Sequence, residues 1–229
     1  MTVRVVSLVP SSTETLLVLG AEVVACTRYC EQPELRAVGG TKNPDIAAIV
    51  SLEPDVVVLD REENRIEDHD ALVSAGLEVF VSDVRSVDAG VEVVEELAAA
   101  VGLDSLVLAD IATVDPLVRA TAFVPIWRRP WMSISTATYG GSLLRRLGIE
   151  LVAVGGEAAY PAVELREVAD LAPDMVLVPS EPYEFSDAHL DELVAAFPNA
   201  DIRRIDGQDL FWWGARTPAA FARLATALT

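Results

Sequence analysis

An internal repeat is the feature that most constrains the fold of this 229-residue chain. Residues 49–59 read IVSLEPDVVVL and residues 168–178 read VADLAPDMVLV, so a leucine, a proline and an aspartate recur at an offset of 119 positions. In each copy, apolar residues at helical spacing end before the proline, and a run of aliphatic residues follows the aspartate. A helix–Pro–Asp–strand unit that occurs twice predicts two lobes with the same α/β architecture.

Strand and helix patterns alternate in the two parts of the chain that contain the copies of the repeat. The first part of the chain predicts strands at 3–9, 22–27, 55–60 and 78–82, and helices over 11–20, from 43–45 onward and over 69–75. The last part predicts strands at 131–135, 175–179 and 202–206, and helices over 139–147, 164–171, 188–197 and 218–228. Ser11 or Ser12 is expected to cap the first helix and Gly20 to close it. Such alternation favours parallel sheets.

The middle of the chain has a different pattern. SVDAGVEVVEELAAAVG and DSLVLADIATVDPLVRATA indicate helix after helix without a strand between them. We therefore predict two Rossmann-like α/β lobes, at 1–85 and 121–229, joined by a long helical connector at 86–120. Ligands of open α/β sheets bind beyond the carboxyl ends of the strands, which predicts a binding cleft between the lobes.

Charge and hydropathy exclude several classes of partner. The net charge is −19, from 36 acidic and 17 basic residues, so phosphate backbones and anionic bilayers repel the chain and no nucleic-acid partner is expected. No apolar run approaches the ~20 residues that a membrane span needs. The start MTVRVVSLVPSSTE lacks the basic and apolar regions of a signal peptide. As given, the sequence indicates a cytoplasmic protein, or one outside the cytoplasm if a leader was removed.

The loops expected to meet at the cleft hold the candidate binding residues. They contain all four tryptophans, six arginines and the single lysine of this acidic chain. Aromatic faces grip large planar ligands, arginine pairs with their carboxylates, and a helix start offers backbone N–H donors to an anionic group. The alternative is that the aromatic residues only fill the lobe cores. The candidate ligand-binding residues are Ser11, Ser12, Tyr29, Arg61, Trp127, Trp131, Tyr183, Trp212, Trp213 and Arg216.

Other polar residues are weaker candidates. Glu62 and Glu63 are read as a solvated face rather than metal ligands, and His69 and His189 as surface histidines. Cys26 and Cys30 lack the partners of a four-ligand zinc site and are expected to be reduced thiols; an axial thiolate from the second of them is the alternative. We predict no metal site and no permanently bound cofactor.

Catalytic motifs are absent from the sequence. It has no G-x-S-x-G, no P-loop, no H-E-x-x-H and no G-x-G-x-x-G, and its serines, histidines and acids have no spacing that assembles a triad. The chain is therefore expected not to be an enzyme, and no catalytic residue is assigned.

Three stretches resemble the signature of class III substrate-binding proteins, the cobalamin, haem and iron-siderophore receptors of ABC importers. They are RVVSLVPSSTETLLVLGA, the YCEQP loop at 29–33 and VGGTKNPDIAAIVSLEPDVVVL. SEPYEF and DGQDLFWWGAR are similar to a branch described as cobalamin-binding or helical-backbone metal receptors. The resemblance implies non-catalytic capture of a corrinoid, or another metal chelate such as haem or a ferric siderophore, in the interlobe cleft. The alternative function is an intracellular enzyme or chaperone of tetrapyrrole or metal-cofactor metabolism.

The resemblance also implies an ABC permease as partner. Receptors of this family dock through a carboxylate on each lobe, on the helix before the Pro–Asp motif. In this chain the family spacing leads to Ala47 and Arg166, neither of which is acidic. The nearby acidic residues are Asp45, Glu164 and Glu167. Permease docking therefore remains open at the level of the sequence.

Overall fold

The computed structural model describes residues 2–108 and 117–228. Within them the chain forms two compact units. The first unit comprises residues 2–84, 88–108 and 213–216, and the second comprises residues 85–87, 117–212 and 217–228. No helix in these described residues is long and apolar enough to cross a membrane.

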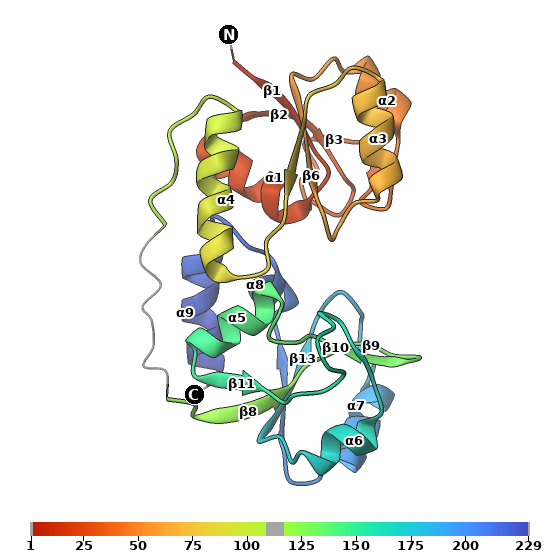
Figure 1. Cartoon of the computed structure of the whole chain (residues 1–229), viewed down its shortest axis with the longest axis vertical. Helices are drawn as coiled ribbons and strands as arrows, with labels where there is room; N and C mark the ends of the chain where they lie inside the picture. Colours follow the sequence, from red (N-terminus) through yellow and green to blue (C-terminus); the bar gives the residue numbers. More distant parts are fainter. Residues whose placement is uncertain (1, 109–116, 229) are drawn as a thin grey trace. The chain divides into compact units, whose positions relative to one another are not determined.

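The first unit is a parallel sheet covered by helices (Figure 1). Within residues 2–108 its strand order is β3-β2-β1-β6-β7, with β1 (Arg4–Ser7), β2 (Glu22–Cys26), β3 (Arg36–Ala37), β6 (Val56–Asp60) and β7 (Val79–Ser82). Its helices are α1 (Pro10–Leu19), α2 (Ile46–Ser51), α3 (Ile66–Ser74) and α4 (Val87–Ala100). A short antiparallel pair, β4 (Gly39–Gly40) and β5 (Asn43–Pro44), completes the unit.

Both faces of the first sheet are buried, because successive strand residues point to opposite sides. Val5 packs in one core cluster with Leu16 of α1 and Leu97 of α4. Its neighbour Val6 packs in another cluster with Ile49 of α2 and Leu72 of α3. This two-sided burial explains why the β6 segment is an unbroken aliphatic run instead of an alternating one.

The second unit contains a parallel sheet and a smaller antiparallel one. Among the described residues the parallel order is β11-β8-β13-β14, with β8 (Ala120–Phe123), β11 (Ile149–Leu151), β13 (Met175–Pro179) and β14 (Asp201–Ile205). The antiparallel order is β12-β10-β9, with β9 (Pro125–Trp127), β10 (Trp131–Ser133) and β12 (Ala162–Val163). The helices are α5 (Tyr139–Arg146), α6 (Leu165–Asp170), α7 (Asp187–Ala196), α8 (Gly207–Phe211) and α9 (Thr217–Ala227).

The sequence repeat is confirmed as a structural repeat. Helices α2 and α6 are followed by Glu53 and Ala172, which both adopt the left-handed region with φ of 47°. A proline comes next, and then Asp55 or Asp174. Each aspartate Oδ2 accepts a backbone N–H near the start of the neighbouring strand, β1 at 2.8 Å and β8 at 2.7 Å. The motif therefore ends a helix, turns the chain and fixes two strands side by side.

The first helix begins one residue earlier than the sequence predicted. Pro10 is its first residue and Val9 is the N-cap, so the predicted capping by Ser11 or Ser12 is wrong. Proline suits this position because its φ is already helical and its missing N–H would have no partner in the helix. Gly20 closes the helix with φ of 83°, as predicted.

The segment 86–120 is only partly helical. Helix α4 confirms the first predicted helix, whereas residues 103–108 and 117–119 form no helix and residues 109–116 lie outside the described residues. Ala120 begins strand β8, so the prediction that this segment contains no strand is wrong at its C-terminal end. Its ATAF sequence has little β-branched character, and pairing with β11 and β13 decides its conformation. The domain boundaries at 85/86 and 120/121 stay predictions.

Candidate functional site

An aromatic cluster lies beside the carboxyl end of β13 in the second unit. The ring centroids of Trp127 and Tyr183 are 5.0 Å apart in an edge-to-face contact. Phe185 lies 4.8 Å from Tyr183 and stacks on Trp131 at 5.8 Å, with 4° between the ring planes. The structure thus brings three predicted site residues together through Phe185, which the sequence analysis missed. Trp127 remains 44% exposed.

A half-exposed carboxylate holds one edge of this cluster. Glu192 Oε2 accepts hydrogen bonds from Nε and Nη2 of Arg128 at 2.9 and 2.6 Å, and its Oε1 accepts one from Trp131 Nε1 at 3.2 Å. Burial would raise the pKa of Glu192, but Arg128 and Trp131 outweigh it and lower that pKa. The indole of Trp131 is therefore fixed by its edge, and its face is free to stack on Phe185.

His189 belongs to the cluster, although the sequence indicated a surface histidine. Its ring lies 5.6 Å from Tyr183 and 6.1 Å from Phe185. Nδ1 accepts the backbone N–H of Ser186 at 3.1 Å, as part of the capping box of α7. That bond leaves the proton of the neutral ring on Nε2, so the ring acts as a helix cap and an aromatic neighbour. Within the described ranges, no three His, Cys, Asp or Glu side chains are grouped to hold a metal ion.

Trp212 is tied to the loop that follows β13. Its Nε1 donates to Glu181 Oε1 at 2.7 Å, and Gly207 N donates to Ser180 Oγ at 2.9 Å. A Cβ at Gly207 would lie 2.6 Å from Glu181 Cγ, so only glycine allows this close approach. The two sequence stretches SEPY and GQDLFWW therefore meet at the carboxyl edge of the second sheet.

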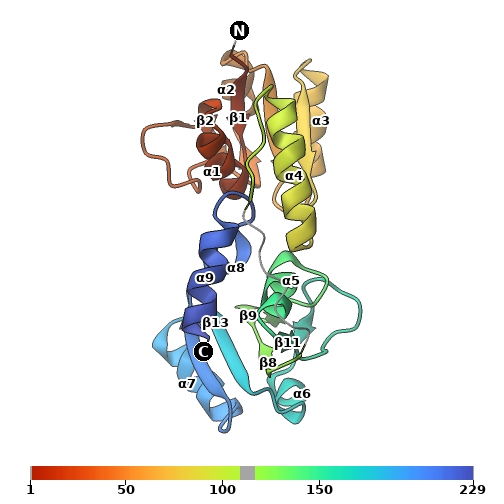
Figure 2. The same cartoon turned by 90° about the vertical axis from the view of Figure 1, so that its left-hand side faces the viewer.

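The next four residues, Trp213–Arg216, pack with the first unit. Figure 2 shows this blue loop beside α1. Arg216 Nε and Nη2 donate to the two carboxylate oxygens of Glu14 at 2.6 and 3.1 Å, and Ala215 N donates to Thr15 Oγ1 at 3.1 Å. Trp213 is only 5% exposed. The ligand contacts predicted for Trp213 and Arg216 stay predictions, and the structure gives both residues a packing role.

The ligand-binding residues predicted in the first unit lie after the ends of its strands. Tyr29 is 52% exposed in the loop after β2, and the Arg28 guanidinium lies 4.9 Å from its ring centroid. Arg28 Nη2 also donates to the Tyr29 hydroxyl at 3.2 Å. Ser11 and Ser12 lie buried in the first turn of α1. Among the described residues, Ser12 Oγ is a buried polar atom without a hydrogen-bond partner.

Asp60 shapes the loop that carries Arg61. Its Oδ1 accepts the backbone N–H groups of Glu62 and Glu63 at 2.9 and 3.3 Å, and its Oδ2 accepts the Ser82 hydroxyl at 2.7 Å. Burial raises the pKa of Asp60 against the effect of these bonds. Arg61 itself is exposed and reaches Asp83 Oδ2 at 3.4 Å. Asp60 is thus a positioning residue that the sequence marks only as the last residue of an aliphatic run.

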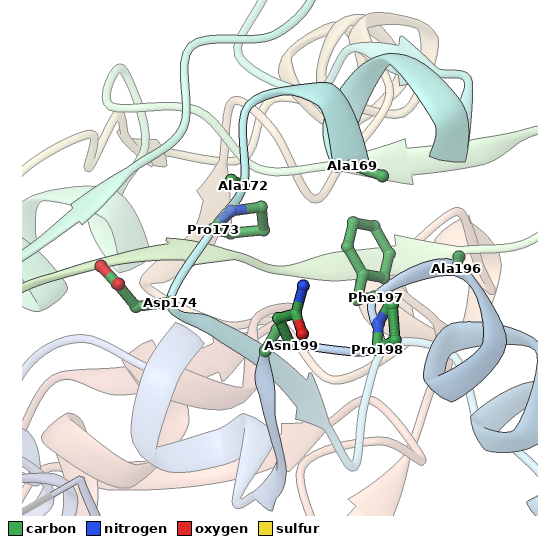
Figure 3. A pocket seen from close by; sticks show the side chains of 9 residues that line it. Ala169, Ala172, Pro173, Asp174, Ala196, Phe197, Pro198 and Asn199 are labelled. Atoms are coloured by element: carbon green, nitrogen blue, oxygen red, sulfur yellow. The ribbon is translucent and has the colours of Figure 1, made fainter.

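A surface pocket of the second unit lies at the opposite edge of the sheet (Figure 3). Its walls include Pro173 and Asp174, directly before β13, and Asn199 and Ala200, directly before β14. The predicted ligand residues lie after the carboxyl ends of these strands. The pocket is therefore separate from the predicted site, and the interlobe cleft stays a prediction.

Parallel sheets covered on both faces, the helix–Pro–Asp–strand repeat and polar or aromatic loops at the strand ends define a class of bilobal α/β binding protein. The sequence of residues 5–197 matches the family described as "Periplasmic binding protein". The chain belongs to this family. The class III fold predicted from the sequence is thereby confirmed. No curated protein sequence matches the chain.

Solved structures with the same fold cover almost the whole chain. The periplasmic vitamin B12-binding protein of Vibrio cholerae is 18% identical with a TM-score of 0.78, covering 99% of this chain and 96% of that one. An ABC transporter substrate-binding protein from Listeria monocytogenes is 17% identical with a TM-score of 0.82, covering 99% and 98%. The periplasmic haem-binding protein of Roseiflexus sp. RS-1 is 22% identical with a TM-score of 0.80, covering 99% and 98%. At these identities the similarity concerns the fold.

Proposed function

We propose that the chain captures a metal chelate without catalysis. A corrinoid of the cobalamin type is the first candidate, and haem and ferric siderophores are the others. The observation that carries the proposal is the Trp127–Tyr183 pair at 5.0 Å, with Trp127 44% exposed beside the carboxyl end of β13. An exposed indole face is suited to cover a conjugated ring and its apolar substituents.

The surroundings of this pair favour binding because they fix the aromatic rings in advance. Phe185 contacts the Tyr183 ring, Trp131 stacks on Phe185, and Glu192 accepts a hydrogen bond from the Trp131 indole. A wall whose rotamers are already fixed loses little side-chain entropy when a ligand arrives. Relatives with this fold include proteins described as binding vitamin B12 and haem, which supports the same ligand class here.

We also propose that the captured ligand is delivered to an ABC permease. Asp45 and Glu164 are the N-caps of α2 and α6, at corresponding positions of the repeat 119 residues apart, and both are exposed. Asp45 Oδ1 accepts the Ala48 N–H at 3.0 Å. In this proposal, the carboxylates of Asp45 and Glu164 make the acidic contacts with the permease, one from each unit, in place of the non-acidic Ala47 and Arg166.

A ligand titration tests the proposal. Cobalamin, haem and a ferric siderophore are each added to the purified protein while tryptophan fluorescence, ligand absorbance and melting temperature are followed. At least one of them is expected to quench the fluorescence and raise the melting temperature, because a ligand of the native state stabilises it. If all three leave the three signals unchanged, the proposal fails.

Variants locate the site. Trp127→Ala is expected to weaken binding by about tenfold or more, or about 1.4 kcal/mol, with the melting temperature little changed. Tyr160→Ala is the matched control, since Tyr160 is another exposed aromatic residue of the second unit, 40% exposed and outside the cluster. Equal losses in both variants would contradict the placement of the ligand on Trp127.

A further inference from the structure

The cysteines of the first unit form a pair at the carboxyl end of β2. Cys26 is the last residue of the strand and Cys30 lies in the loop that follows it. Both are free thiols, each 1% exposed. The Cys30 N–H donates to the Thr27 carbonyl at 3.1 Å, so a tight turn separates the two cysteines, and each thiol shifts the pKa of the other. Two interacting thiols are a different chemical group from two separate buried cysteines.

Hydroxyl groups converge on the Cys30 sulfur. Thr27 Oγ1 lies 3.2 Å from it, where either atom can be the donor, and the same oxygen accepts the Tyr29 N–H at 3.3 Å. Thr13 Oγ1 also lies 3.2 Å away, and shares its hydrogen between this sulfur, Ser7 Oγ and the Val9 carbonyl. The sulfur therefore lies within hydrogen-bond distance of two hydroxyl groups, which stabilise a thiolate when they donate to it.

The surroundings shift the pKa values of the two thiols in opposite directions. The Cys26 hydrogen bond, with those of Thr13 and Thr27, lowers the pKa of Cys30 to about 6 against the effect of burial. The same contact, together with burial, raises the pKa of Cys26. A buried cysteine in apolar surroundings has a raised pKa and is inert, whereas a lowered pKa is typical of reactive cysteines.

We propose that Cys26 and Cys30 are a redox-active dithiol, which converts reversibly to an intramolecular disulfide by exchange with a small disulfide RSSR. The Cys30 thiolate attacks one sulfur of RSSR, forms a Cys30–SR bond and expels RS⁻. The Cys26 thiol then loses its proton, attacks the Cys30 sulfur and expels a second RS⁻. The two thiols are oxidised by two electrons, and RSSR is reduced to two RSH.

The loop provides the access that this exchange requires. Cys26 is held in the sheet, since β2 pairs with β1 and β3. Cys30 lies in a turn whose neighbours Arg28, Tyr29 and Glu31 are exposed, and its N–H donates to the Thr27 carbonyl at 3.1 Å. Opening this turn exposes Cys30 without separating the strands, so Cys30 is the attacking residue and Cys26 the resolving one.

A disulfide would close a small ring around Arg28 and Tyr29. Their conformational freedom would fall, and the exposed tyrosine predicted to contact the ligand lies inside that ring. The dithiol chemistry itself does not depend on the proposed ligand, so the two proposals are tested separately.

Oxidation of the folded wild-type protein by glutathione disulfide tests the proposal. After quenching with an alkylating agent, intact-mass spectrometry is expected to show the loss of two hydrogens, with one disulfide in the peptide that contains residues 26–30. Dithiothreitol is expected to reverse the change. The proposal is overturned if the protein stays reduced, if it carries two glutathione adducts, or if oxidation is no faster than global unfolding measured by urea-jump kinetics.

Variants assign the roles. Cys26→Ser is expected to stop at a single glutathione adduct on Cys30, and Cys30→Ser to react at least about tenfold more slowly than the wild type. Thr27→Val removes a donor and is expected to slow the exchange at neutral pH about threefold or more, because less thiolate is present. Thr15→Val is the control, since its hydroxyl bonds the Ser11 carbonyl and the Ala215 N–H. Equal reactivity of both serine variants would overturn the assignment, and if either fails to fold, the wild-type peptide mapping decides.

Discussion

Carboxylates hold three of the residues that the sequence singled out for ligand binding. Glu192 accepts a hydrogen bond from the Trp131 indole, and Glu181 accepts one from the Trp212 indole. Glu14 accepts hydrogen bonds from Nε and Nη2 of Arg216. In a chain with 36 acidic residues, part of the negative charge thus positions aromatic and cationic side chains. Only pairs with buried or fixed geometry contribute much to stability, because exposed pairs are screened by solvent.

Glu14→Gln is expected to destabilise the protein. The Glu14–Arg216 pair is mostly buried, with side-chain exposures of 28% and 16%, and its bonds measure 2.6 and 3.1 Å. Losing the charge weakens a bidentate bond, which costs about 1–3 kcal/mol for charged partners. Urea unfolding measures the loss, and Glu95→Gln on an exposed face of α4 is the control. A loss no larger than that of the control would show that the pair is dispensable.

Gly214→Ala is expected to cost more than Gly76→Ala. Both glycines have positive φ, 97° and 83°, so both substitutions introduce backbone strain of about 1 kcal/mol. Gly76 has open space around its Cβ position, whereas a Cβ at Gly214 would collide with Thr15 Oγ1. The difference between the two unfolding free energies measures the collision alone. Equal costs would indicate that the loop moves away from α1 freely.

At the scale of elements, the Pro–Asp repeat predicts matched effects in the two units. Glu53 and Ala172 both have φ of 47°, which strains any residue that carries a Cβ. Ala172→Gly and Glu53→Gly are each expected to leave stability unchanged or raise it by up to about 1 kcal/mol. Ala169→Gly, inside α6, is expected to lower it by about 1 kcal/mol. Differential melting of the three variants measures this contrast, and losses in all three would contradict it.

The strand-capping bond of Asp174 gives a pH-dependent prediction. The N–H and hydroxyl of Thr121 lower the pKa of Asp174 from its ordinary 3.8. Since the folded pKa is depressed, the stabilisation is present above pH 3.8 and is lost as the pH falls through the folded pKa. Asp174→Asn is expected to be less stable than the wild type near pH 7, and the two are expected to converge in acid. Asp170→Asn, on exposed α6, controls for the change of charge. A pH-independent difference would contradict the carboxylate's role.

Elements with strong local patterns were predictable from the sequence. The aliphatic runs of β1, β6 and β13 and the glycine that closes α1 were all placed correctly. Helix α8 was missed because it has only five residues, and its formation depends on Asp206, whose side chain accepts the Gln208 and Asp209 N–H groups. Such a short helix has no periodicity, so its capping residue was the only local signal.

The aromatic cluster was predictable only in part. Three of its aromatic residues were named from loop positions, but Phe185, at the end of the SEPYEF stretch, and Glu192, on a helix without any motif, connect and fix them and were not named. Trp212 and Trp213 are adjacent in sequence, yet they belong to different compact units. Contacts between distant segments decide such outcomes, and a single sequence does not encode them in a local pattern.

At the scale of the whole molecule, the net charge of −19 has a consequence for stability. Like charges repel each other more in the folded chain than in the expanded one, so the repulsion lowers the free energy of unfolding. Added salt screens it, since the Debye length falls from about 30 Å at 0.01 M to about 8 Å at 0.15 M. Salt also weakens exposed ion pairs, but such pairs contribute little to stability, whereas the net charge of −19 gives a large excess of negative charge.

Sodium chloride is therefore expected to raise the melting temperature at pH 7. A gain of about 1 kcal/mol corresponds to about 2–4 °C for a chain of this size. Scanning calorimetry at 0.01 and 0.15 M salt measures the shift. Near the sequence pI of about 4.3 the net charge vanishes, so the same salt step is expected to leave the melting temperature unchanged or lower it. A comparable rise at both pH values would show that the effect comes from salt exclusion at apolar surface instead of charge screening.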